Sequence, residues 1–161
     1  MATFDKFIRN LRRGIGKSFS KRKMRQLGKI AIERIQKRTR RGYGVARTGQ
    51  NQRRLKPLSD SYIDHRRRNR RRLDKTTSPR KSNLTFTGRL LRSMVIKQVS
   101  NRKVTWGPKA NRRAGDGGLT NEELGIIVTE MGRPFNNLSK QDIKAIKREM
   151  DKALRMSIRK L

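Results

Sequence analysis

SKQDIKAIKREMDKALRMSI, residues 139–158, is the stretch that decides the fold of this chain. Its first residues, Ser139 and three positions later Asp142, resemble a capping box with Asp in place of Glu. Apolar side chains then recur at the 3.6-residue spacing of one helical face: Ile143, Ile146, Met150, Leu154 and Ile158. The spacing therefore predicts an amphipathic helix over 140–158 whose apolar face packs on a core.

A second helix is expected just before it. Thr120-Asn-Glu-Glu123 is a capping box, and it predicts a helix that runs to about Met131 and ends at Gly132. The preceding residues 109–119, KANRRAGDGGL, are rich in glycine and are expected to form a loop.

A hairpin is expected further upstream. The stretch LTFTGRLLRSMVIKQV predicts a short helix over 87–93 and then a strand over 94–99. Residues 100–102 make the turn, and residues 103–106 return as the second strand.

The N-terminal half predicts two helices. Phe4, Phe7, Ile8 and Leu11 share one face of a short amphipathic helix over 4–12. Ser20 caps a longer helix to about Arg40, with apolar positions Met24, Leu27, Ala31 and Ile35. Residues 41–54 carry three glycines and no periodicity, so they are interpreted as a loop.

Together these elements predict an α+β fold in a single domain, 1–161, with residues 1–19 as a short amphipathic helix and arm. A small antiparallel sheet, including 94–99 and 103–106, is packed by the long N- and C-terminal helices over 20–40 and 140–158. Basic irregular segments join the elements.

The charge of the chain is extreme. Lys and Arg number 45 against 12 Asp and Glu, a net charge of +33, and residues 1–81 alone carry +23. Such a chain repels itself unless a polyanion or an acidic partner neutralises it. The chain has no cysteine, which excludes a disulfide framework and thiolate chemistry. It also has no apolar run near the roughly 20 residues of a membrane span.

The densest basic stretch is HRRRNRRR, residues 65–72, with six arginines in eight positions. Ser59 is a good N-cap, so a helix over about 60–72 is expected to carry the arginines in its last two turns. Residues 74–83, DKTTSPRKSN, are interpreted as a polar linker.

Several basic runs in one half of a chain favour contact with nucleic-acid phosphate. The eight Phe, Tyr and Trp are too few for a base-stacking surface, so contact with the backbone and not with base sequence is expected. The candidate phosphate-contacting residues are Lys21, Arg22, Lys23, Arg25, Arg66, Arg67, Arg68, Arg70, Arg71 and Arg72.

Catalytic residues are hard to find in this sequence. His65 is the only histidine, and it is interpreted as an exposed helix residue beside the arginines. The carboxylates are scattered, and LRRGIGKS over 11–18 has Leu11 where a phosphate-binding loop needs glycine. The prediction is a protein that is not an enzyme and needs no cofactor or metal.

Three landmarks point to a family by their order. Pro57-Leu58-Ser59 begins the basic helix, LTFTGRLLRSM over 84–94 leads into the hairpin, and EMGRPF over 130–135 precedes LSKQD over 138–142. This order resembles the virion morphogenesis family of tailed phages, which comprises tail-completion or neck proteins of the phage Mu and lambdoid type. The resemblance covers roughly residues 20–158.

The resemblance implies a structural protein of the phage head–tail junction. Such a protein is a subunit of a homo-oligomeric ring, a hexamer or dodecamer, around the channel through which double-stranded DNA leaves. Its neighbours in the virion are head-closure, tail-terminator or tail-tube proteins. A ring around DNA needs basic groups that face the phosphates, which agrees with the positive charge of this chain.

Two alternatives stay open. A ribosomal or other RNA-binding structural protein also tolerates extreme positive charge and an absence of cysteine. Within the phage interpretation, the arginines of 65–72 contact either DNA or acidic patches on neighbouring neck proteins.

Overall fold

The computed structural model describes residues 20–110 and 118–158. The predicted helix over 4–12 and most of the glycine-rich loop lie outside these ranges. The elements in chain order are α2 Lys21–Arg40, β1 Tyr43–Gly44, β2 Arg53–Arg54, α3 Asp60–Arg68, a 3₁₀ turn Arg70–Arg72, α4 Arg89–Arg92, β3 Met94–Val99, β4 Val104–Pro108, α5 Asn121–Glu130 and α6 Lys140–Ile158. The α+β class predicted from the sequence is confirmed.

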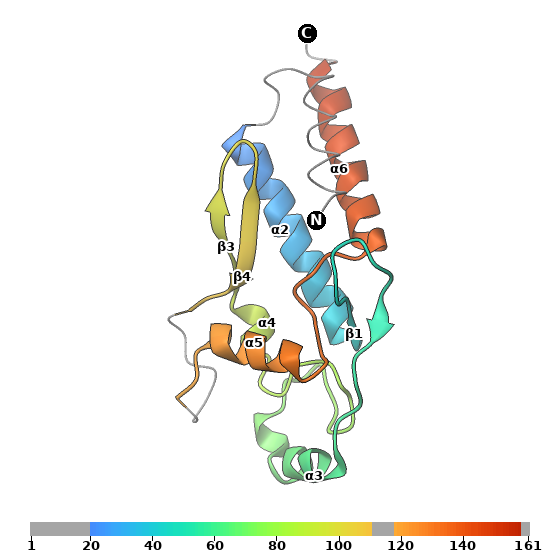
Figure 1. Ribbon diagram of the computed structural model, residues 1–161, viewed down its shortest axis with the longest axis vertical. Helices are drawn as coiled ribbons and strands as arrows, with labels where there is room; N and C mark the ends of the chain where they lie inside the picture. Colours follow the sequence, from blue (N-terminus) through green and yellow to red (C-terminus); the bar gives the residue numbers. More distant parts are fainter. Residues whose placement is uncertain (1–19, 111–117, 159–161) are drawn as a thin grey trace.

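The long helix α2 is the centre of the packing. Figure 1 shows it between the β3–β4 hairpin on one side and α6 on the other, and α2 contacts both strands and α6. The hydrophobic cluster formed there consists of Met24, Leu27, Ala31, Ile32, Ile35, Leu90, Leu91, Met94, Phe135, Leu138, Ile146 and Met150. Half of these positions are those whose spacing predicted the two long helices.

The close approach of α2 to the hairpin depends on a glycine. A Cβ at Gly28 would lie 2.8 Å from Cγ2 of Val104 and 3.0 Å from Cδ1 of Ile96. Those distances are shorter than a normal packing contact, so a larger residue at this position would push the helix off the sheet. The helix itself starts where expected, because the Ser20 side chain accepts a hydrogen bond from the backbone N–H of Lys23.

The hairpin confirms the first predicted strand and extends the second. β3 pairs antiparallel with β4 from Met94 opposite Pro108 to Val99 opposite Val104, with a register shift between Ile96 and Gln98. The second strand was expected over 103–106 and lies at 104–108, because Gly107 and Pro108 still pair with β3 and are both buried.

Both predicted capping boxes form. The Thr120 hydroxyl accepts from the backbone N–H of Glu123, whose carboxylate accepts from the backbone N–H of Thr120. These hydrogen bonds hold the pKa of Glu123 below its ordinary value. At the start of α6, Asp142 Oδ2 accepts from the Ser139 backbone at 3.0 Å, and the Asp142 backbone donates to the Ser139 hydroxyl at 3.1 Å. Ile146 and Met150 are buried, whereas the expected core positions Leu154 and Ile158 lie outside the described side chains.

Asp142 has a second role that the capping pattern did not reveal. Its carboxylate forms an ion pair with Arg38 of α2, and both side chains are almost completely buried. Arg38 also donates to the backbone carbonyls of Phe135 at 2.6 Å and Asn137 at 2.8 Å. Burial lowers the pKa of Arg38, and the charge of Asp142 opposes that shift. This pair therefore joins α2, α6 and the segment before α6.

The segment 41–54, interpreted as a loop, also contains two short strands, β1 and β2. Tyr43 and Gly44 pair antiparallel with Arg54 and Arg53, and the segment is fastened to the chain just before α6. Val45 N–H donates to Pro134 O at 3.0 Å, and Gly49 N–H donates to Leu138 O at 2.7 Å. The partners lie about 90 residues away in sequence, so local periodicity could not predict them.

Below this core the chain is layered along the longest axis of the molecule. Figure 1 shows α4 and α5 beneath the hairpin and α3 at the bottom. The start of α2 and the tip of the hairpin lie at the other end, near the top of the view. The predicted basic segments are therefore distributed over both ends.

Candidate nucleic-acid interface

The arginine stretch begins on a well-capped helix that is shorter than predicted. The Ser59 hydroxyl accepts from Tyr62 N–H at 3.4 Å, and Asp60 lies in the first turn of α3. Asn69 is the C-cap of the helix: its backbone leaves the helical geometry at φ −100° and ψ 32°, and its side-chain amide donates to His65 O at 2.9 Å. The expected helix over 60–72 therefore stops at Arg68, and Arg70–Arg72 continue as a 3₁₀ turn.

The break at Asn69 leaves five arginine side chains exposed at this end of the molecule. We call them the arginine end: Arg67, Arg68, Arg70, Arg71 and Arg72. A hollow of about 520 Å³ is lined by residues 68–72 alone. Arg67 pairs with Asp64 at 2.8 Å, but both side chains are about half exposed, so this pair neutralises little of the charge.

Arg66 does not belong to this surface. It is only 2% exposed, so the prediction that it contacts phosphate is wrong. Its guanidinium donates to Lys81 O at 2.9 Å and to the Thr77 hydroxyl at 3.2 Å, and it lies about 6 Å from the ring centres of Tyr62 and Phe86. Burial lowers its pKa, and Tyr62 opposes that shift.

The segment 74–83, predicted as a polar linker, is folded around Arg66. Thr77 donates to Asn83 Oδ1 at 2.9 Å, and the Asn83 amide donates to Arg40 O at the end of α2. At the other end of the segment, Asp74 pairs with Arg92 of α4 at 2.6 Å. Hydrogen bonds from Thr76 to its carboxylate hold the pKa of Asp74 below its ordinary value. The segment thereby fixes the arginine end on the rest of the molecule.

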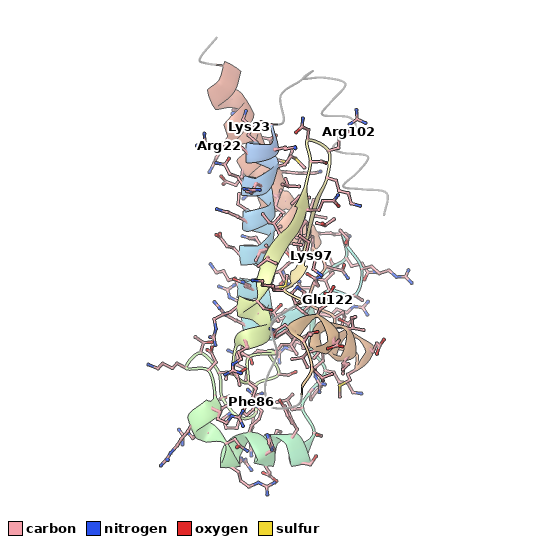
Figure 2. The ribbon with its side chains drawn as sticks, turned by 90° about the vertical axis from the view of Figure 1, so that its left-hand side faces the viewer. Arg22, Lys23, Phe86, Lys97, Arg102 and Glu122 are labelled. Carbon is pink, nitrogen blue, oxygen red and sulfur yellow. The ribbon has the colours of Figure 1, made fainter. Side chains whose placement is uncertain are left out.

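The other predicted basic residues, Lys21, Arg22, Lys23 and Arg25, lie on the first turns of α2. All but Lys23 are exposed, and no acidic residue lies in the first turn of the helix. Figure 2 places Arg22 and Lys23 at the same end of the molecule as Arg102, at the tip of the hairpin. Arg102 and its exposed neighbour Lys103 were missed in the sequence, because they stand apart from any basic run.

The structure does not bring the two predicted clusters together. α3 lies at the bottom of both views, whereas Arg22, Lys23 and Arg102 lie at the top (Figure 2). One short segment of duplex therefore cannot contact both basic clusters at the same time. The molecule therefore offers two separate basic surfaces to a polyanion.

Other chemistry has little support in the described part of the chain. Across residues 20–110 and 118–158, His, Asp and Glu side chains nowhere gather in a group of three that could hold a metal ion. His65 is exposed, as predicted, and its ring stacks on Tyr62 at 6.0 Å between centres. Within the same ranges, no helix combines the length and apolar character that a membrane crossing requires.

Comparisons of the chain with models of protein families, with curated proteins and with solved structures found no match.

Proposed function

We propose that this chain is a structural protein of the head–tail junction of a tailed phage. It forms a ring subunit around the DNA channel, and its arginine end holds DNA phosphates without reading base sequence. The phage role rests on the ordered landmarks in the sequence, and the DNA contact rests on the charge and geometry of the described residues.

The observation that carries the DNA contact is the exposure of five arginines over 67–72, four of which line one hollow. Guanidinium groups bind phosphate oxygens through two parallel hydrogen bonds, so a group of them suits the repeating charge of a duplex. The nearby acid Asp64 is exposed, and its ion pair with Arg67 neutralises little of the charge. Aromatic side chains near α3 pack on Arg66 and one another, which leaves charge as the means of contact.

Binding to labelled duplexes tests this function. Three unrelated duplex sequences of equal length should bind with equal dissociation constants, because phosphate contacts carry no sequence information. An RNA duplex or single-stranded RNA of equal charge should compete no better than DNA. A strong preference for RNA would favour the alternative of an RNA-binding structural protein.

The neighbouring genes give an independent test of the phage role. Genes for portal, head-closure and tail-tube proteins on either side would agree with it, whereas genes for ribosomal proteins or translation factors would contradict it. The two tests are separable, since DNA binding can hold even if the phage role fails.

A further inference from the structure

An apolar groove lies beside the arginine end and shares Arg72 with it. Its volume is about 690 Å³, and it runs between α3, residues 84–90 and α5. Tyr62 and Phe86 form one wall, and Ile127 of α5 and its C-cap residue Met131 form another. Tyr62, Ile127 and Met131 are 40%, 36% and 56% exposed, so the apolar surface continues beyond the groove into solvent. An apolar surface of this kind marks an interaction site.

The charged residues that line the groove all have one sign. Arg72, Arg89 and Arg133 are among its lining residues, and no Asp or Glu is. Arg66 forms part of its wall as a buried cation, and no carboxylate within the described residues pairs with it. The Nε of Arg66 and the hydroxyl of Thr85, both in lining residues, have no hydrogen-bond partner in the described chain. A ligand with carboxylates and apolar side chains complements such a groove.

The same charges argue against two other occupants. Residues 1–19 carry five basic residues and one acidic residue, so like charges oppose the docking of the chain's own N-terminal segment. A second copy brings a further charge of +33 to the contact. The occupant that fits is therefore an acidic segment of a different protein.

We propose that this groove binds an acidic amphipathic helix of another protein. Apolar side chains on one face of that helix lie between α3 and α5, as in other helix-in-groove complexes, and its carboxylates face Arg89 and Arg133. The site adjoins the proposed DNA contact at Arg72, whereas Arg67, Arg68, Arg70 and Arg71 do not line it.

The probe is a labelled helical peptide of about 14 residues, roughly 21 Å long, with leucines at i, i+3, i+4 and i+7 and glutamates elsewhere. Fluorescence anisotropy with the full chain should show saturable binding. Replacing the glutamates by glutamine should weaken that binding, and so should Arg89→Gln in the protein.

Two substitutions, one on α5 and one at its C-cap, form a matched pair. Met131→Asp places a carboxylate in the groove, and Ile126→Asp places one on a residue that does not line the groove. The two side chains are equally accessible, at 56% and 55% exposed, so both variants should keep the wild-type circular dichroism and melting temperature. Met131→Asp should weaken peptide binding about tenfold or more, and Ile126→Asp should leave it near the wild-type value.

Four results would overturn the proposal. The first is that the peptide fails to bind, and the second is that Met131→Asp and Ile126→Asp weaken binding equally. The third is that Gln at 67, 68, 70 and 71 abolishes binding that Met131→Asp leaves intact. In the last of these cases the acidic helix binds the arginine end. The fourth result is self-association of the free protein that Met131→Asp abolishes, which would make a second copy the occupant. None of these results changes the outcome of the DNA measurement, so the two proposals fail separately.

Discussion

Arginines that are neighbours in the sequence have different roles in this structure. Arg66 and Arg67 are adjacent, yet one is buried against Tyr62 and Phe86 and the other is exposed. Of the arginines over 66–72 that were predicted to contact phosphate, all are exposed except Arg66, which is buried. The residues that bury Arg66, such as Thr77 and Lys81, belong to a segment that the sequence marks only as polar, and their contact with it depends on tertiary folding.

Asp142 shows the same limit for acidic residues. Its capping role followed from the spacing to Ser139, whereas its ion pair with Arg38 spans 104 residues and could not be predicted. Breaking a buried pair leaves an uncompensated charge, which costs far more than removal of an exposed pair.

Asp142→Asn should therefore destabilise the fold by about 3 kcal/mol or more, because Arg38 then stays buried without its carboxylate. Urea denaturation followed by circular dichroism measures the change. Asp151→Asn, an exposed position on the same helix, is the control and should have little effect. A destabilisation below about 1 kcal/mol in Asp142→Asn would show that the carbonyls of Phe135 and Asn137 suffice for Arg38.

Secondary structure was predictable where local signals act alone. The N-cap at Ser20, the Thr120 capping box and the 3.6-residue period of α6 each depend on residues within a few positions of one another. The errors arose where distant contacts decide, as where Val45 and Gly49 bond to the chain before α6. They also arose where one side chain redirects the backbone, as Asn69 does after α3.

The apolar face of α6 leads to a prediction about folding. Ile146 and Met150 are each 1% exposed, so Asp at either position would place an unpaired carboxylate in the core. Both variants should lose the cooperative thermal transition. Gln141→Asp adds the same charge at an exposed position of α6 and should melt as the wild type does. A retained cooperative transition in both core variants would contradict the packing of α6 on α2.

At the scale of the whole molecule, the charge of +33 governs association. The two basic surfaces lie at opposite ends of the long axis (Figure 2), so neutralisation at one end leaves the other positive. A ring brings such subunits together, and repulsion opposes ring formation until a polyanion or acidic partner is present.

Sedimentation velocity at low salt should therefore show mainly monomer. Addition of duplex DNA should produce larger species, because phosphate removes the repulsion between subunits. A stable ring of the free protein at low salt would show that the apolar contact between subunits outweighs their repulsion.

The salt dependence of duplex DNA binding tests the central claim most directly. Gln at Arg67, Arg68, Arg70 and Arg71 should flatten the plot of log K against log salt by about 0.9 for each phosphate that the variant no longer binds. The four side chains are exposed, so the melting temperature should hardly change. The matched control replaces Arg47, Arg53, Arg54 and Lys109 by Gln; these residues are also exposed, and their replacement removes the same charge elsewhere. A flatter slope in the first variant alone is the predicted result, and equal slopes in both variants would contradict phosphate binding at the arginine end.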